Sequence, residues 1–153
     1  EKLSEEGGFN EELFYRVASL PVHLPPVRER VDVMDELLKH LGNIYANQNQ
    51  IKAAGAYYQK AISIDPRMAA AHNNLASMYS LSGQYEVAIQ EFEKALEFAP
   101  GMASAHYGMG LCMYNLKDFS GASTKFKETL ALNPNIFDAR DKLQICMRQS
   151  GIR

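Results

Sequence analysis

Two histidines and two cysteines carry the most reactive side chains in this sequence, and each pair is separated by 34 residues. His72 and His106 form one pair, and Cys112 and Cys146 form the other. A zinc site needs several such ligands to converge on one point. Since neither histidine has a cysteine or an acidic residue at ligand spacing, we predict that both pack in the core or form hydrogen bonds. We predict no metal site.

The same interval determines what we expect of the cysteines. Helices that pack side by side lie about 8–10 Å apart, which is too far for a disulfide. Ile44 and Met78 occupy the earlier positions in the same series of 34-residue steps. We therefore predict that Cys112 and Cys146 are small, buried, reduced side chains, as in a cytoplasmic protein.

No catalytic motif accompanies these residues. The sequence lacks H-E-x-x-H, a Ser-His-Asp arrangement and a pair of carboxylates placed for acid–base catalysis. It also lacks the phosphate-binding pattern G-x-x-x-x-G-K-[ST]. We predict that the chain is not an enzyme, has no catalytic residue and uses no cofactor.

The composition is typical of a globular protein. Of the 153 residues, 46% are hydrophobic and 22% are charged, which argues against wholesale disorder. The net charge of -2 gives no broad attraction for nucleic acid or for an anionic membrane. Residues Glu1–Glu6 do not resemble a secretory signal, and no apolar run is long enough to span a bilayer. We predict no direct nucleic-acid binding, no membrane insertion and a cytoplasmic location.

A period of 34 residues extends through most of the chain. Small residues, alanines, aromatic residues and prolines recur in the same order in three successive stretches. These positions are Gly42, Ala76 and Gly110; Ala54, Ala88 and Ala122; Tyr58, Phe92 and Phe126; and Pro66, Pro100 and Pro134. A fixed period of this length is typical of a stacked array of helix pairs.

Each recurring residue type has a role in a helix pair. Small residues allow the two helices of a unit to cross closely, and the aromatic residues supply buried apolar area. Each proline ends a second helix. Asn49 and Gly83 suit the left-handed turn between the two helices. Lys117 suits that conformation less well, so we expect the third turn to be looser.

On these residues the sequence resembles the tetratricopeptide repeat (TPR) family over about two-thirds of its length. The resemblance implies an all-α fold, a right-handed superhelical solenoid of three helix pairs. The expected TPR domain covers residues 35–153, with units 35–68, 69–102 and 103–136 and a capping helix over 137–150. The resemblance also implies a protein-interaction scaffold that binds a peptide or a helix of a partner in its concave groove.

In this family the first helix of each unit lines the groove, and the resemblance transfers that role to matching positions here. These are Lys39, Asn43, Asn47, Asn73, Asn74, Ser77, Leu81, Tyr107, Leu111, Tyr114 and Asn115. Some family members clamp the C-terminal carboxylate of a peptide. Lys39, Asn43 and Asn74 match three clamp positions. Ser104 and Gly108 stand where the family has two basic residues.

The first 34 residues differ from the array. Apolar residues recur at helical spacing over about 10–19, and three prolines predict extended backbone over 20–28. The stretch GGFNEELFYRVASLPVHLPPVRER resembles part of the AAA+ domain of bacterial sigma-54-dependent transcription activators. Since the nucleotide-binding motif is missing, we interpret residues 1–34 as an AAA+-like remnant in a bacterial protein.

The expected N-terminal helix has an apolar side that needs a partner surface. It comprises Phe9, Leu13, Phe14, Val17 and Leu20. We hypothesise that this side packs on a repeat array, its own or a neighbouring molecule's, and so supports a homo-oligomer. Two alternatives to a standalone scaffold stay open: a fragment of a sigma-54-dependent regulator whose repeats sense a signal or bind a partner, and a repeat appendage of a peptidase or transferase.

Overall fold

The computed structural model describes residues 27–151, with side chains from residue 36 onward. The chain divides into two units, Glu1–Arg30 and Val31–Arg153. The helices described below belong to the second unit, except for the first four residues of α2, residues 27–30. The predicted helix at 10–19 and its apolar residues Phe9, Leu13, Phe14, Val17 and Leu20 lie outside the described residues.

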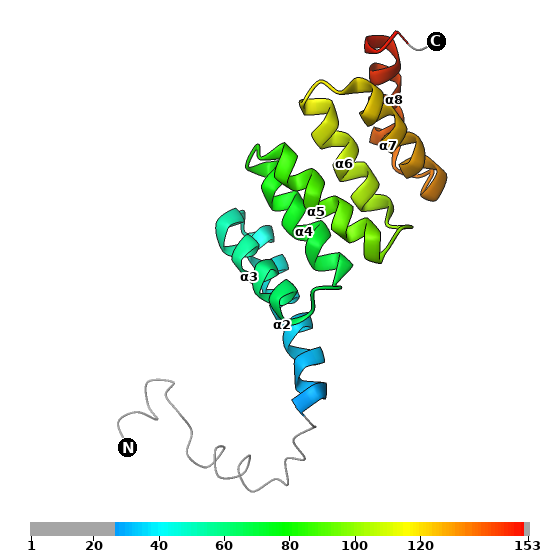
Figure 1. Ribbon diagram of the computed structural model, residues 1–153. Coiled ribbons are helices and arrows are strands. Elements are labelled where there is room, and N and C mark those ends of the chain that lie inside the picture. Colours follow the sequence, from blue (N-terminus) through cyan, green and yellow to red (C-terminus); the bar gives the residue numbers. More distant parts are fainter. Residues whose placement is uncertain (1–26, 152–153) are drawn as a thin grey trace, which may run out of the picture. The chain divides into compact units, whose positions relative to one another are not determined.

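Consecutive antiparallel helices form the described part of the chain, and residues 27–151 contain no strand. Figure 1 shows the helix pairs stacked side by side, from α2 and α3 to α6 and α7, with α8 following them. The helices are α2 (Val27–Asn47), α3 (Ile51–Ile64), α4 (Ala69–Leu81), α5 (Tyr85–Phe98), α6 (Ala103–Asn115), α7 (Phe119–Leu132) and α8 (Phe137–Gln149). This confirms the all-α helical-repeat fold.

Helix α2 begins earlier than the proline pattern predicts. Val27 and Arg28 are helical, so the prediction of extended backbone over 20–28 is wrong at these two residues. The reason is local: the last proline of the segment is Pro26. A proline restricts itself and the residue before it, but a helix can start directly after it.

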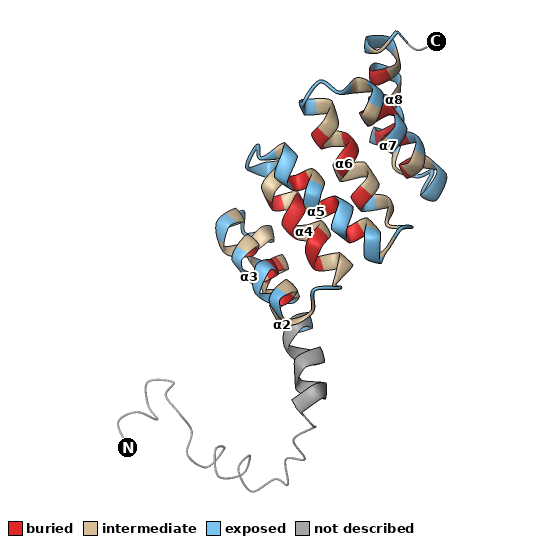
Figure 2. Ribbon diagram, in the orientation of Figure 1, coloured by how far each residue is buried: buried red, intermediate tan, exposed pale blue. Residues whose placement is uncertain are grey.

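Each helix pair has its own aromatic core. Tyr58, Phe92 and Phe126 are at most 1% exposed, and each centres one of three clusters of buried residues. Figure 2 shows buried residues along the stacked helices, and each of the helices α3 to α8 contains some. A Cβ placed on Gly42 would lie 2.5 Å from Tyr58 Cε1, closer than real Cβ atoms approach. Gly42 and Gly110 therefore make room for the aromatic rings of Tyr58 and Phe126.

The turns between the two helices of each unit share one geometry. Asn49, Gly83 and Lys117 have φ values of 58°, 77° and 67°. In each turn the following N–H donates to a carbonyl five residues earlier, at 2.9 Å in all three cases. The expectation of a looser turn at Lys117 is therefore wrong. Asp118 accounts for the difference, because its side chain accepts a 2.9 Å hydrogen bond from the Gly121 N–H and caps α7.

Helix α8 follows the third helix pair. Ala139 and Cys146 of α8 are buried in the third cluster, and Leu143 packs against it. Gln144 stands one period after Gly110 but is exposed. Cys112 and Cys146 are buried free thiols, and burial raises the pKa of each. In the part of the chain that the structure describes, no helix is long and apolar enough to cross a bilayer.

Candidate functional site

The predicted groove residues lie on the first helices of the three units. Helix α4 contacts α6, and Asn74 of α4 donates a hydrogen bond to Asn43 of α2, so the first helices are neighbours. We call the surface that they form the first-helix face. Its predicted residues are Lys39, Asn43 and Asn47 on α2; Asn73, Asn74, Ser77 and Leu81 on α4; and Tyr107, Leu111, Tyr114 and Asn115 on α6.

The structure brings four of these residues together in one pocket. Asn43, Asn47, Asn74 and Ser77 line a pocket of about 400 Å³ between α2 and α4. Ala46, Tyr58 and Met78 complete its lining. The pocket lining thus combines amide groups with apolar atoms, a combination suited to a peptide main chain with small side chains.

A hydrogen-bond network fixes the amides of this pocket. Asn43 Oδ1 accepts from the Tyr58 hydroxyl at 2.7 Å and from Asn74 Nδ2 at 2.9 Å. Burial raises the pKa of Tyr58, and the Asn74 side chain opposes that shift. Asn43 Nδ2 and the Asn47 amide have no partner among the described residues, so they are the groups available to a ligand.

Lys39 is less available than the sequence suggests. Its ammonium group pairs with Glu36, one turn earlier on α2. Glu36 also lies 3.8 Å from His40 Nε2. The positive charge expected at this end of the groove is therefore balanced locally.

The clamp positions of the third unit are occupied by other contacts. Ser104 Oγ donates to Asn73 Oδ1 at 3.4 Å. At Gly108 a Cβ would lie 2.7 Å from Phe92 Cε1 and 2.9 Å from Cε2. A basic side chain therefore cannot be placed there while Phe92 fills the core. At these two described positions there is therefore no basic group to bind a carboxylate.

Tyr107 joins α6 to α8. Its hydroxyl donates to Asp138 Oδ2. Burial, followed by the hydrogen bond and the charge of Asp138, raises the pKa of Tyr107 to about 12. Its ring is tilted against Phe126, with centroids 6.0 Å apart. This predicted groove residue thus also has a structural role.

The far end of the face is aromatic and apolar. Tyr114 meets Phe119 edge to face at 5.6 Å, and Lys142 Nζ lies 5.0 Å from the Tyr114 ring centroid. Asn115 Nδ2 donates to the Leu111 carbonyl at 2.9 Å. Leu81 is 68% exposed, which makes it the most accessible apolar side chain among the predicted groove residues.

Sequence reasoning missed the contribution of α8 to this face. Asp138 and Ile145 stand one period after Ser104 and Leu111, and Lys142 contacts Tyr114. Ile145 is 37% exposed. The 34-residue period indicated these positions of α8. They were not considered because α8 was interpreted only as a capping helix.

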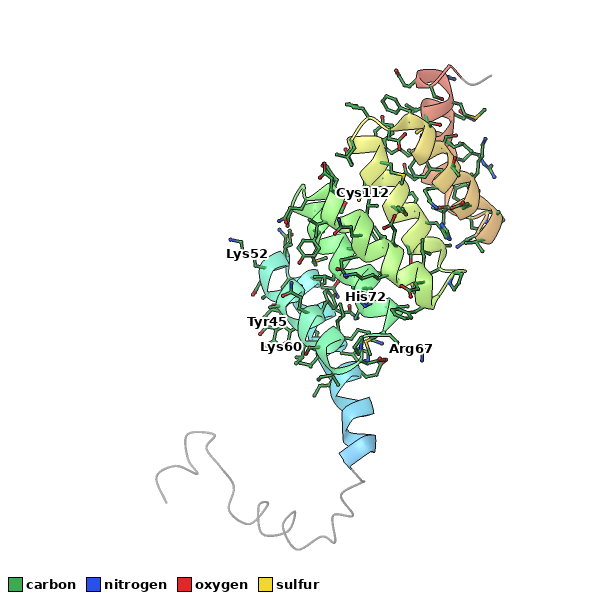
Figure 3. The ribbon with its side chains drawn as sticks, in the orientation of Figure 1. Tyr45, Lys52, Lys60, Arg67, His72 and Cys112 are labelled. Atoms are coloured by element: carbon green, nitrogen blue, oxygen red, sulfur yellow. The ribbon has the colours of Figure 1, made fainter. Side chains whose placement is uncertain are left out.

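The two histidines form hydrogen bonds, as predicted, but their acidic partners were not foreseen. His72 Nδ1 lies 2.7 Å from Glu91 Oε2, and Nε2 lies 3.0 Å from the Pro66 carbonyl oxygen. Figure 3 shows His72 inside the helix stack. His106 Nε2 lies 3.0 Å from the Pro100 carbonyl oxygen. Its Nδ1 is 2.9 Å from Glu128 Oε2, without the alignment of a hydrogen bond.

Each of the two glutamates also accepts a hydrogen bond from a lysine one helical turn away. The lysine follows Glu91 in the sequence but precedes Glu128. Lys94 donates to Glu91 at 2.7 Å, and Lys125 donates to Glu128 at 2.9 Å. Burial raises the pKa of Glu91, but hydrogen bonds from Lys94 and His72 bring it below its ordinary value. The Lys125 hydrogen bond lowers the pKa of Glu128. Within residues 36–151, no three His, Cys, Asp or Glu side chains are grouped to hold a metal ion.

Comparison with known proteins gives three sets of similarities. Two models described as tetratricopeptide repeat match residues 34–101 and 79–141. The NtrC DNA-binding transcriptional regulator of Klebsiella pneumoniae is 41% identical over 49 residues, 32% of this chain and 10% of that protein. A signal-transduction and transcriptional-control protein of Clostridium beijerinckii is 39% identical over 44 residues, 29% of this chain and 7% of that protein.

These regulators fit the resemblance to sigma-54-dependent activators, and the chain spans about a tenth of the length of the curated relatives that it matches.

Solved structures show the same repeat fold. The first TPR of Spaghetti (RPAP3), bound to the HSP90 peptide SRMEEVD, has a TM-score of 0.75 and 24% identity, covering 77% of this chain and 94% of that one. The Sgt2 TPR domain of Aspergillus fumigatus has a TM-score of 0.71 and 26% identity, covering 76% and 79%. With both repeat models matching the helix pairs described above, this chain belongs to the tetratricopeptide repeat family.

Proposed function

We propose that this chain is a non-enzymatic protein-interaction module that binds an extended peptide or a helix of a partner protein on its first-helix face. The observation that carries the proposal is the pocket between α2 and α4. There, Asn43 Nδ2 and the Asn47 amide are unpaired within the described structure, beside apolar lining atoms.

The chemistry of the face suits a peptide main chain more than a C-terminal carboxylate. An asparagine amide can donate to a peptide carbonyl and accept from a peptide N–H. Leu81, Leu111 and Tyr114 offer apolar contact further along. The peptide-bound RPAP3 domain has the same fold. Since Ser104 and Gly108 replace the basic clamp residues, we propose that internal residues of the partner, not its C-terminus, provide most of the affinity.

A binding experiment with selected peptides tests this proposal. Peptides selected from a phage-displayed random library on the full chain would be synthesised, and their Kd measured by fluorescence polarisation. Replacing Asn47 or Leu81 by alanine is expected to weaken binding about fivefold or more, the loss of one hydrogen bond or one apolar contact. Gln90→Ala, on the exposed side of α5, is the matched control. Equal affinities in all four proteins would contradict the proposal.

A second candidate function rests on the similarity to NtrC-type regulators. In it, the repeats are the sensing or partner-binding part of a sigma-54-dependent transcription regulator. The parent open reading frame distinguishes the two, because an intact nucleotide-binding motif upstream of Glu1 favours the regulator. Nucleotide binding by the full-length gene product would then be measured directly.

Self-association through the apolar side of residues 9–20 stays a prediction. Deleting residues 1–26 is expected to lower the oligomeric state in sedimentation equilibrium. An unchanged oligomeric state together with an unchanged melting temperature would contradict it.

A further inference from the structure

A second pocket lies between α3 and α4, lined by residues other than the predicted groove set. It has a volume of about 280 Å³, and we call it the α3 pocket. Apolar atoms of Ile51, Gly55, Ala56, Leu75 and Met78 contribute to its lining. Of the residues that line the α3 pocket, only Met78 also lines the pocket between α2 and α4.

Gly55 is the residue that opens this pocket, and no close contact requires it to be glycine. At the other helical glycines of residues 36–151, an added Cβ would meet a neighbour at 3.0 Å or less. At Gly55 the nearest atom would be Leu75 Cδ1 at 3.8 Å, an ordinary contact. A mid-helix glycine costs about 1 kcal/mol relative to alanine. Packing inside the chain therefore does not explain why this position is glycine and not the more stable alanine.

The other units fill the corresponding space with side chains. Ile89 stands one period after Gly55, and Tyr85 one period after Ile51. Both pack against the core cluster of the second unit. In the third unit Phe119 packs in the same way, and Ser123 is buried. The first unit thus has smaller residues than the other two units at the positions of Ile51 and Gly55, both of which line the α3 pocket.

The rim of the pocket is positive. Lys52 is the charged residue of the lining, and it has no ion-pair partner among the described residues. Figure 3 shows its side chain projecting away from the ribbon. Helix α3 contains Lys52 and Lys60 but no Asp or Glu. Beside them, the Tyr79 hydroxyl accepts from Gln59 Nε2 at 3.0 Å and keeps its own proton free to donate.

The volume limits what can enter. Small-molecule sites usually enclose about 300–1,000 Å³, so this pocket is small for a cofactor but large enough for one aliphatic side chain. An apolar side chain in the pocket would shield its apolar lining from water. A carboxylate on the adjacent residue could then form an ion pair with Lys52. We propose that the α3 pocket binds an apolar side chain of a partner protein, with Lys52 pairing to a carboxylate on the neighbouring residue of that partner.

Three short peptides test both halves of the proposal. The probes are acetyl-Ala-Leu-Glu-Ala-amide, the same peptide with Gln for Glu, and the same peptide with Ser for Leu. Each is titrated into the ¹⁵N-labelled full chain while the amide signals of Gly55 and Ala56 are followed by NMR. The Leu-Glu peptide is expected to give a saturable shift. The Gln peptide should bind roughly two- to fivefold more weakly, as for an exposed ion pair, and the Ser peptide about tenfold more weakly.

Variants of the pocket provide the matched controls. Gly55→Ile introduces the residue of the second unit and should weaken the Leu-Glu peptide about tenfold or more. Gly55→Ala, for which there is room, should have a smaller effect of the same sign. Lys52→Ala should cost roughly two- to fivefold, whereas Lys60→Ala, on the same helix but outside the pocket, should change nothing.

Several results would overturn the proposal. Equal shifts of the Ala56 amide signal in Gly55→Ile and the wild-type protein would do so, as would shifts confined to the residues around Asn47. Binding of 4-methylpentanoate at Gly55 without binding of any peptide would identify a small-molecule site instead. Since Asn47→Ala leaves the α3 pocket intact, the first-helix function and this one can fail separately.

Discussion

Gly108 on α6 lies against the ring of Phe92 on α5, with no room for a Cβ between them. The contact joins the second unit to the third. It also removes a side chain from a position where some family members bind a carboxylate. Core packing and surface chemistry are therefore coupled at this residue, and the core contact excludes the basic group.

Adding a Cβ at this contact should destabilise the protein. Gly108→Ala is expected to lower the free energy of unfolding by about 1–3 kcal/mol, a typical cost of overpacking. Urea unfolding followed by circular dichroism measures it. The control is Gly101→Ala, where nothing lies within 4 Å. A shorter side chain in Phe92→Leu should relieve part of the added cost, so the double variant should be non-additive. Additive losses would contradict the contact.

The third turn should be open to stabilisation. Lys117 has a φ of 67°, a conformation that costs a residue with a Cβ roughly 1 kcal/mol. Lys117→Gly is therefore expected to raise the free energy of unfolding by about 0.5–1 kcal/mol. Gly83→Ala, at the equivalent turn, should lower it by a similar amount. Thermal melts of both variants measure the two effects. Changes in melting temperature of the same sign would contradict the prediction.

The Glu91 contact predicts an acid-sensitive contribution to stability. Its pKa in the folded protein is below the ordinary 4.5. The contribution is therefore present above pH 4.5 and is lost as the pH falls through the lower folded value. At neutral pH, Glu91→Gln should cost about 1–2 kcal/mol because His72 and Lys94 lose a charged acceptor. Below about pH 5, the stability of the Glu91→Gln variant should also fall less than that of the wild-type protein.

Urea midpoints at several pH values measure this difference. Glu97→Gln is the control, because Glu97 is exposed and has no ion pair within the described residues. Parallel acid profiles for the wild-type and Glu91→Gln proteins would contradict the assignment.

The Tyr107 side chain should ionise only at high pH, and its hydrogen bond should stabilise the packing of α8. Its pKa of about 12 lies above the ordinary 10.0. Its contribution is therefore complete below pH 10 and is lost as the pH rises towards 12. Near-ultraviolet absorbance should show a late tyrosine ionisation that is absent from Tyr107→Phe. That variant should lose about 1 kcal/mol of stability with its hydrogen bond, whereas Tyr85→Phe, with no side-chain hydrogen bond in the described structure, should not.

The repeat pattern predicted those features that depend on residues close in sequence or on the period itself. The helix ends at the prolines, the left-handed turns at Asn49 and Gly83, and the small residue opposite each aromatic ring are of this kind. The third turn was judged wrongly because the preference of Lys117 was weighed alone. The Asp118 cap beside it offsets that preference.

The sequence by itself determined the repeat array, because a fixed period makes each unit bury the same residues against its neighbours. Only the tertiary structure decided which polar side chains meet. Asn43 and Asn74 are 31 residues apart, and His72 and Glu91 are 19 apart, intervals set by how the helices are aligned and not by any motif. The α3 pocket depends on tertiary structure for a further reason. Gly55 stands where the second unit has Ile89, which packs against its core. Only the packed structure shows whether neighbouring side chains occupy the space that glycine leaves.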